Sequence, residues 1–209
     1  MPTTNSSAAL RKRRAGGGKR ILVLDTVAEV LAERGYENTR FADVSAASGV
    51  AISTLQNYFG SRADMVVEAM ELATTREVDA LESVAAAEHD PWARLVALVD
   101  RSLDNAYRSQ QMLVEFWRSA MRDDELREFG TEVWERYRAP FLAAVCEGRE
   151  QGAFTPTAGP DDVVDLVLSA LAGATVFRVV HHPAPPPAGF RGVLLAQLRS
   201  MLGLGVAAR

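Results

Sequence analysis

The sequence predicts an all-α protein of about nine helices, with three short helices near the N-terminus and a longer helical part after them. Three observations lead to this fold class. Apolar residues recur at intervals of three and four, as on one face of an α-helix, and no segment alternates as a half-buried strand does. Ala, Leu, Arg and Glu, which favour helices, are abundant among the 209 residues. Gly, Pro, Asp and Thr stand where such helices would begin or end.

The N-terminal end predicts an arm followed by the first helix. Residues 1–18 are polar, then basic at Arg11–Arg14, and then rich in glycine, so we expect a disordered basic arm. In the helix that follows, Gly35 is placed to end it. Its apolar face consists of Ile21, Leu24, Ala28 and Leu31.

Two short helices are predicted next. The first covers 41–48, with Thr39 as its N-cap and Gly49 just beyond its end. The second covers 52–59 and turns Ile52, Leu55 and Phe59 inward. A helix of barely two turns is marginal in isolation, so its neighbours must stabilise it. We therefore expect the function of this short helix to depend on the polar side chains that it exposes.

The rest of the chain predicts six further helices. One starts near Ser61 and runs to the middle eighties, and another begins at Pro91, where Asp90 can cap it. The next covers 112–121, and a long helix starts at Asp123.

Proline and glycine divide the last third of the chain. Pro140 should kink or split the long helix, because proline lacks the N–H that the helical ladder needs. A helix over 163–177 follows, with acidic residues near its start that suit the helix dipole. A proline-rich loop separates it from a last helix over 194–202.

Charge is divided unevenly along the chain. Residues 1–62 carry a net charge of +4, whereas the whole chain carries −4, so the remainder is strongly acidic. A basic end on an acidic body indicates that only this end meets nucleic acid.

Other classes of function have little support in the sequence. Gly16–Gly18 follows no strand, no serine lies in a nucleophile elbow, and His181–His182 has no carboxylate at ligand spacing. We therefore expect no enzyme, no cofactor and no metal site. The single cysteine, Cys146, excludes an internal disulfide and is expected to be a small buried hydrophobe. No uncharged apolar run of 18 residues and no signal peptide are present, so we expect a cytoplasmic protein without a membrane span.

The two short helices joined by SGVA describe a helix-turn-helix, whose second helix enters the major groove of DNA. Residues 20–66 resemble the DNA-binding domain of the TetR family of transcriptional regulators. The matching positions are Gly35-Tyr36, Thr39, Val44, Ala47, Gly49-Val50, Thr54-Leu55, Tyr58-Phe59 and Ser61-Arg62. The resemblance implies a DNA-binding domain over 19–65 and a helical domain for ligand binding and dimerisation over 66–205.

The resemblance also implies roles for single residues. Thr39, Tyr58 and Arg62 would meet phosphates, and the exposed face of the third helix would read base edges. Gln56 is a natural bidentate partner for adenine. The DNA-binding residues predicted in this way are Thr39, Arg40, Ser53, Thr54, Gln56, Asn57, Tyr58 and Arg62.

Several positions depart from the family pattern. Ala51 stands where Ser or Thr is usual, so the third helix loses its N-cap at a cost of about 1 kcal/mol. Ile52 and Ser53 replace Lys and Gly, Gln56 replaces Tyr, and Arg62 replaces Lys. These changes leave DNA binding as the expectation but make the operator sequence unpredictable from the family.

Each of these roles has a plainer alternative. Gln56 and Asn57 would also suit a merely solvated helix face, and Tyr58 would also suit the edge of the core. The arm at Arg11–Arg14 either tracks phosphates or enters the minor groove, or is a solvated tail.

The last two helices are expected to form a two-fold dimer interface, as the resemblance implies. A two-fold dimer would read two half-sites of an operator. The alternative is ordinary packing within one chain. The residues predicted for this interface are Val163, Val167, Ala170, Ala174, Phe177, Leu194, Leu198 and Met201.

The middle helices carry large side chains that suit either a core or the wall of a ligand pocket. A pocket is expected because of the family resemblance. The candidates for its wall and its polar anchors are Tyr107, Trp117, Arg118, Met121, Trp134, Tyr137 and Arg178.

Together these features predict a ligand-responsive transcriptional regulator, most often a repressor in this family, which binds a palindromic operator as a homodimer. A small apolar or amphipathic effector would release it from DNA. The alternative is a small-molecule-binding helical protein of the same fold without sequence-specific DNA binding.

Overall fold

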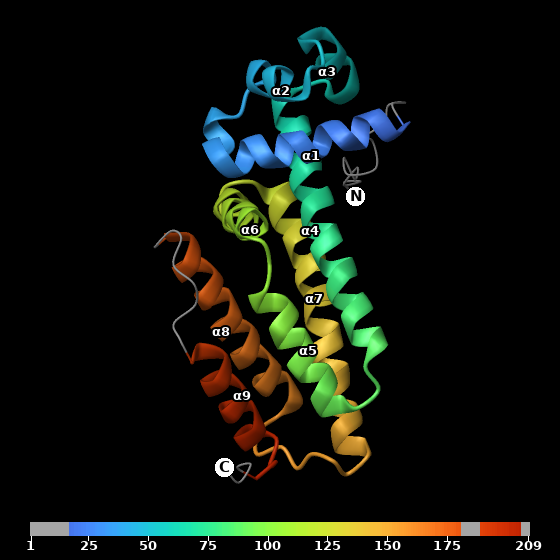
Figure 1. The fold of residues 1–209 in the computed structure, drawn as a ribbon, viewed down its shortest axis with the longest axis vertical. Helices are drawn as coiled ribbons and strands as arrows, with labels where there is room; N and C mark the ends of the chain where they lie inside the picture. Colours follow the sequence, from blue (N-terminus) through green and yellow to red (C-terminus); the bar gives the residue numbers. More distant parts are fainter. Residues whose placement is uncertain (1–16, 181–188, 206–209) are drawn as a thin grey trace, which may run out of the picture. The chain divides into compact units, whose positions relative to one another are not determined.

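The computed structural model describes residues 17–180 and 189–205, and within them the chain is all α-helical, as predicted (Figure 1). A single 3-10 turn, η2 (Tyr36–Asn38), follows the first helix. Residues 1–16 of the predicted arm 1–18, with Arg11–Arg14, and the His181–His182 pair lie outside the described residues. The last two residues of the predicted arm, Gly17 and Gly18, belong to α1 instead. The nine α-helices of the described residues are α1 (Gly17–Arg34), α2 (Phe41–Ser48), α3 (Ile52–Phe59), α4 (Arg62–Ala87), α5 (Pro91–Leu103), α6 (Tyr107–Ala120), α7 (Asp124–Glu150), α8 (Pro160–Val180) and α9 (Phe190–Met201).

Three local predictions are corrected by the structure. Helix α2 is N-capped by Arg40 and not by Thr39, and the Arg40 N–H donates to Oδ2 of Asp43 at 3.0 Å. Helix α6 begins at Tyr107, earlier than predicted. Helix α7 continues through Pro140, so the long helix is not split. A proline inside a helix removes one hydrogen bond, and the rest of this 27-residue helix keeps it intact.

The chain forms two compact units. Among the described residues, unit 1 contains those up to Ala73 together with Glu115–Gly130, and unit 2 contains Thr74–Val114 and those from Thr131 onward. Unit 1 therefore takes in the end of α6 and the start of α7, a segment that the resemblance alone would place in the C-terminal domain.

Unit 1 is built around α1, which packs against α2, and α2 in turn packs against α3 (Figure 1). Of the residues predicted to face inward on α3, Leu55 and Phe59 are buried, but Ile52, in the first turn, is 43% exposed. Ile21, predicted on the apolar face of α1, is likewise exposed. Arg20 of α1 lies over the Phe59 ring, 5.0 Å from its centroid, and pairs with Glu68 of α4. These contacts hold the short helix α3 against longer ones.

Unit 2 has a large apolar core to which α5, α7, α8 and α9 contribute. Helices α8 and α9 lie side by side, and both contact α5 (Figure 1). Arg138 of α7 donates to Asp161 and Asp165 of α8 at 2.6 and 2.7 Å, and its hydrogen bond lowers the pKa of Asp161. Arg191 of α9 pairs with Asp100 of α5. Ion pairs thus fix the outer helices around the core.

Helix α8 is apolar on more than its core-facing side. Among the described helices, α8 alone is long and apolar enough to cross a membrane, with a mean hydropathy of 1.9. Buried core helices of non-membrane proteins have the same length and composition. Part of α8 packs into the core of unit 2, while Leu166, Phe177 and Val180 are exposed. Helix α8 is therefore apolar both on the side that packs into the core and on a side that is exposed.

Candidate functional site

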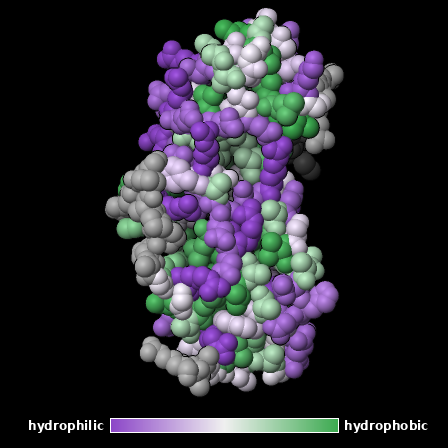
Figure 2. All heavy atoms as spheres, viewed as in Figure 1, coloured by the Kyte–Doolittle hydropathy of each residue, from purple (hydrophilic) through white to green (hydrophobic). Residues whose placement is uncertain are grey.

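Helix α3 presents a polar outer face. Ser53, Gln56 and Asn57 are exposed, whereas Thr54 and Tyr58 are half-buried. Tyr58 packs edge-on against the Phe59 ring at a centroid distance of 6.1 Å, so part of this side chain covers the core. In Figure 2 the surface over α2 and α3 mixes weakly polar and hydrophobic residues with strongly hydrophilic ones. Exposure of this kind is what a residue needs in order to read a base edge.

Glycines shape the connection on both sides of α3. Gly49 adopts φ +70°, in the left-handed region, and its N–H donates to the Ser45 carbonyl at 3.0 Å. Gly60 adopts φ +83° and donates to the Gln56 carbonyl at 2.8 Å. A residue with a Cβ would be strained at either position. Ala51, by contrast, gives α3 no side-chain cap, as its side chain predicts.

Thr39 does not offer its side chain to a phosphate. The residue is fully buried, and its hydroxyl donates to the Gly35 carbonyl at 2.9 Å. The predicted phosphate contact through this side chain is therefore wrong for this conformation. The hydroxyl instead closes the turn between α1 and α2.

Arg62 also acts within unit 1. Its Nη1 donates to the Tyr36 and Thr39 carbonyls, the latter at 3.0 Å, and its guanidinium lies 4.9 Å from the centroid of the Tyr36 ring. These contacts occupy the side chain that was expected to meet a phosphate. Arg40 differs, because it is exposed at the start of α2. Arg40 is therefore the better candidate for a phosphate contact.

Glu115 connects the end of α6 to the end of α1, a role that the sequence analysis did not predict. One oxygen of its carboxylate, Oε1, accepts a hydrogen bond from the Tyr36 N–H, and both oxygens accept from Arg118, at 2.9 and 2.6 Å. Burial raises the pKa of Glu115, but the hydrogen bonds from Arg118 and Tyr36 outweigh it, and the net pKa is lowered. Gly35 leaves room for this carboxylate, which lies 3.6 Å from where a Cβ would stand.

The residues predicted for a ligand pocket are not gathered in one place. Met121 is 72% exposed and Trp134 is 40% exposed, so neither forms the wall of an enclosed pocket. Tyr137 packs against the core of unit 2, where its hydroxyl lies 2.7 Å from that of Ser102. Burial raises the pKa of the Tyr137 phenol, and the hydrogen bond with Ser102 opposes this rise.

The remaining ligand candidates are placed as follows. Arg178 donates from Nη1 to the Asn105 carbonyl at 3.2 Å, and Tyr107 and Trp117 are half-buried. Arg118 is paired with Glu115 and lines a small cavity of unit 1.

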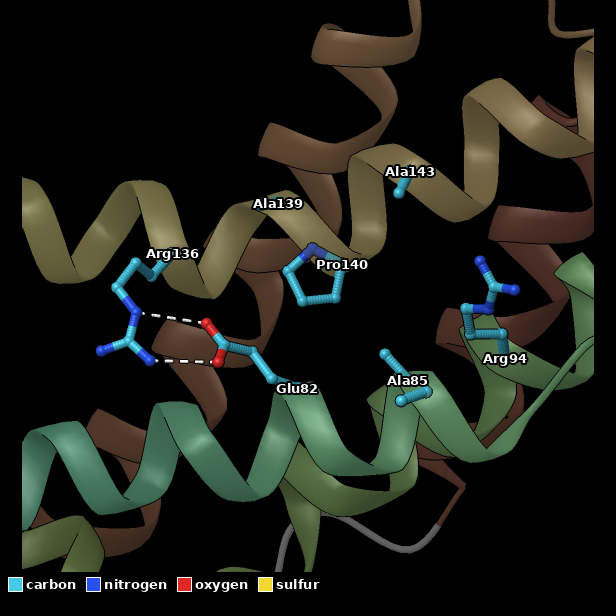
Figure 3. Close-up of a pocket in the computed structure, with 8 residues that line it drawn as sticks. Glu82, Ala85, Arg94, Arg136, Ala139, Pro140 and Ala143 are labelled. Carbon is cyan, nitrogen blue, oxygen red and sulfur yellow. Dashed lines mark hydrogen bonds and ion pairs between the residues drawn. The ribbon is translucent and has the colours of Figure 1, made fainter.

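A groove in unit 2 lies between α4 and α7 (Figure 3). Its volume is about 380 Å³, and alanines and Pro140 form its floor. Arg136 and Glu82 pair at one end, and Arg94 lies at the other, where it pairs with Glu147 at 2.7 Å. The groove is thus apolar in the middle and charged at its ends. Its lining residues are Glu82, Ala85, Ala86, Arg94, Arg136, Ala139, Pro140 and Ala143.

Gln110 of α6 is a second feature that the sequence analysis missed. The residue is buried, and its Oε1 has no hydrogen-bond partner among the residues that the structure describes. A buried polar atom without a partner costs about 1–3 kcal/mol, which a bound polar group would recover. A glutamine in the first turn of an otherwise ordinary helix gives no signal of this in the sequence.

The prediction of the dimer face is wrong, because most of the predicted residues are buried within a single chain. Val163, Val167, Ala174, Leu194 and Leu198 are all buried within unit 2, so they cannot form an interface. Ala170 and Met201 pack beside the core, and only Phe177 of the predicted set is exposed.

Another face of the same two helices is exposed and apolar. The exposed apolar face, as we call it, consists of Leu166, Val176, Phe177 and Val180 on α8 and Val193 on α9. Gly173 and Gly192 lie on the same helices, and nothing stands within 4 Å of where their Cβ atoms would be.

Among residues 17–180 and 189–205, no group of three or more His, Cys, Asp and Glu side chains is arranged to hold a metal ion. Cys146 is half-buried rather than buried.

A helix-turn-helix with an exposed polar second helix, joined to a large helical unit, defines the class of DNA-binding transcriptional regulators. Residues 23–69 match the family model described as bacterial regulatory proteins, tetR family. Residues 91–203 match the model described as BetI-type transcriptional repressor, C-terminal. The chain therefore belongs to the TetR family of transcriptional regulators.

One curated relative is the HTH-type transcriptional regulator YvdT of Bacillus subtilis (strain 168), which is 23% identical over 126 residues. The match covers 60% of this chain and 62% of the relative, less than two thirds of its length.

Solved structures of the same fold come from several organisms. A transcriptional regulator from Rhodococcus sp. Rha1 has a TM-score of 0.75 and 19% identity, with 90% of this chain and 98% of that one covered. FadR from Bacillus subtilis, in complex with stearoyl-CoA, has a TM-score of 0.72 and 15% identity, with 89% and 99% covered. A regulator from Saccharomonospora viridis, in complex with choline, has a TM-score of 0.70 and 22% identity, with 84% and 92% covered. At these identities the likeness is one of fold.

Proposed function

We propose that this chain is a ligand-responsive transcriptional repressor, which acts in the cytoplasm and binds a palindromic operator as a homodimer. The observation that carries the DNA-binding part is the exposure of Ser53, Gln56 and Asn57 on one face of α3. This face of a helix-turn-helix enters the major groove, where Gln and Asn are bidentate partners for adenine. The repressor role is supported by the description of the family model that residues 91–203 match.

Fluorescence anisotropy with the DNA upstream of its own gene tests this proposal. We expect Gln56→Ala or Asn57→Ala to weaken binding about tenfold, because a good bidentate pair discriminates by about 1–3 kcal/mol. Gln151→Ala, at an exposed glutamine just beyond α7, is the matched control and should leave the affinity unchanged. If the protein binds a scrambled duplex equally well, the alternative of a ligand-binding protein without sequence-specific DNA binding is favoured.

For the dimer, we propose the exposed apolar face in place of the face predicted from the sequence. Phe177 is 42% exposed and Val180 is 68% exposed on α8, and Val193 is 63% exposed on the neighbouring α9. Apolar patches of this kind mark interfaces. The exposed Gly173 and Gly192 would let the helices of two copies approach closely. Two half-sites of an operator also require a two-fold partner.

Light scattering tests the dimer. We expect the wild type to have twice the chain mass of 22.7 kDa. The double variant Phe177→Glu/Val180→Glu should have the mass of a single chain. Leu22→Glu changes an equally exposed apolar residue of α1 and should leave the dimer intact. A monomeric wild type, or a dimeric double variant, would refute this interface.

We propose that a small apolar or amphipathic molecule is the effector, and that it binds in unit 2. The α4–α7 groove has an apolar floor with charged ends, which suits such a molecule, and its volume of about 380 Å³ is within the range of ligand sites. The two ligand complexes named above contain an acyl thioester and a quaternary ammonium, so stearoyl-CoA and choline are suitable first probes.

Thermal unfolding tests the effector proposal, because a ligand that binds the native state raises the melting temperature. We expect a saturable rise with one of these probes, and a loss of that rise in Ala143→Trp, which fills the groove. Ala158→Trp, in an exposed loop, is the control. No rise with either probe would contradict the proposed class of effector, and an unchanged rise in Ala143→Trp would exclude the groove.

A further inference from the structure

Unit 1 contains a small cavity next to the Glu115–Arg118 pair. Its volume is about 120 Å³, which corresponds to about four water molecules at their liquid volume and is enough for a phosphate or carboxylate group. The residues that line it are Tyr36, Glu37, Arg118, Ser119, Arg122 and Asp123. Every one of them belongs to unit 1.

Ser119 is the polar residue of this cavity that lacks a partner. The residue is 9% exposed, and its Oγ is buried without a hydrogen bond to any described residue. Native proteins rarely leave a buried hydroxyl unpaired, so a group in the cavity that accepts its hydrogen bond would remove a cost.

The arginines add further unused donors. Arg118 spends Nε and Nη2 on Glu115, which leaves Nη1 without a partner in the described part of the chain. Arg122 is exposed, and its guanidinium makes no hydrogen bond or ion pair to a described side chain. A guanidinium has five donors and no acceptor, so it favours an oxyanion.

The acidic side chains near the cavity are mostly engaged. Glu115 accepts from Arg118 and from the Tyr36 N–H, and Oδ1 of Asp123 accepts the Leu126 N–H at 3.1 Å at the start of α7. Glu37 is exposed. The formal charges of the lining balance, and the pKa of Arg118 is raised by its hydrogen bond to Glu115 and also by the charge of Glu37. The Ser119 hydroxyl and Nη1 of Arg118 are donors of this cavity that no described acceptor satisfies.

We propose that this cavity binds a small oxyanion, a phosphate or a carboxylate group, held by Ser119, Arg122 and the free end of Arg118. This site is separate from the base-reading face of α3 and from the α4–α7 groove, and it does not depend on the function proposed above. Since Arg118 also holds Glu115, which accepts from the Tyr36 N–H, the Tyr36 amide reports on occupancy.

Protein NMR of the full chain tests the site. Sodium phosphate and sodium acetate are titrated separately at constant ionic strength, with sodium chloride as the balancing salt. We expect saturable shifts of the Tyr36 and Ser119 amide signals with at least one of them. A larger affinity for phosphate identifies a phosphate site, and equal or larger affinity for acetate identifies a carboxylate site. Shifts that do not saturate with either anion would overturn the proposal.

Amino-acid substitutions test whether the anion binds in this cavity. Ser119→Ala combined with Arg122→Gln should weaken the anion affinity about tenfold or more, because hydrogen bonds to charged groups are lost. Arg122→Gln alone, at an exposed side chain, should weaken it severalfold and serves if the double variant does not fold. Arg149→Gln removes an exposed charge near the end of α7 and should leave the affinity within about twofold. Equal affinity in Arg122→Gln and Arg149→Gln would overturn the assignment.

Discussion

Replacement of Arg62 by alanine is expected to weaken DNA binding by loosening unit 1 and not by removing a phosphate contact. The guanidinium donates to the carbonyls of Tyr36 and Thr39 and lies over the Tyr36 ring. It thereby joins the first residue of α4 to the turn that connects α1 with α2. Without it, two carbonyl groups lose their charged donor.

The size of the effect follows from these contacts. A hydrogen bond from a charged donor contributes about 1.5–3 kcal/mol, and a partly exposed cation–π contact about 0.5–1 kcal/mol. Both hydrogen bonds come from the same nitrogen, Nη1, and the side chain is half-buried, so their contributions do not add fully. We expect Arg62→Ala to lower the free energy of unfolding of unit 1 by about 2–4 kcal/mol.

The assay combines urea unfolding with the salt dependence of DNA binding. A lost phosphate contact lowers the slope of log K against log salt concentration by about 0.9 per phosphate, whereas a lost internal contact leaves the slope unchanged. Arg62→Ala should therefore lower stability and affinity without changing the slope. Arg40→Ala, at an exposed arginine, should lower the slope and leave stability unchanged. A normal unfolding curve together with a reduced slope for Arg62→Ala would refute this reasoning.

Three further substitutions have definite expected outcomes. Tyr137→Phe removes the hydrogen bond to Ser102 and should lower the urea midpoint by the equivalent of about 0.5–1.5 kcal/mol, and an unchanged midpoint would contradict that hydrogen bond. Gly148→Ala places a Cβ 2.2 Å from the buried Phe154 ring and should cost about 1–3 kcal/mol in the same assay, whereas a neutral effect would show that the ring can move aside. Glu115 has a lowered pKa in the folded state, so its stabilisation is present above its ordinary pKa of 4.5 and is lost as the pH falls through the folded pKa. The wild type should therefore be more stable than Glu115→Gln at pH 7, and unfolding curves at decreasing pH should show this difference shrinking below about pH 4.5; a constant difference would exclude the carboxylate as its source.

Local signals in the sequence were sufficient to predict the helix-turn-helix. The bounds of α2 and α3 match the predicted ranges, because Gly49 and Gly60 adopt positive φ at their ends. Helical spacing gave the inward side of α3 for Leu55 and Phe59, which are buried, and was wrong for Ile52, which is exposed at the start of the helix.

The hydrogen-bond partners of the polar side chains could not be predicted from the sequence. Thr39 and Arg62 have the residue types of phosphate ligands, yet the Thr39 hydroxyl and Nη1 of Arg62 donate to nearby carbonyls. The Tyr36 N–H meets Glu115, which lies 79 positions later in the chain. No periodicity relates residues so far apart, and the choice among acceptors depends on how the helices pack.

The dimer face could not be predicted from the sequence for a different reason. A stripe such as Val163, Val167 and Ala174 identifies an apolar side of a helix, but α8 has more than one such side. Spacing therefore could not choose between the side that enters the core and the side that carries Phe177.

The exposed apolar face of α8 and α9 also has a consequence for how strongly this regulator responds to its own abundance. If operator occupancy requires two chains joined through that face, the active species forms by a second-order reaction, and at low protein levels its amount follows the square of the chain concentration. A modest fall in synthesis would then lower operator occupancy more steeply than a single-chain regulator allows.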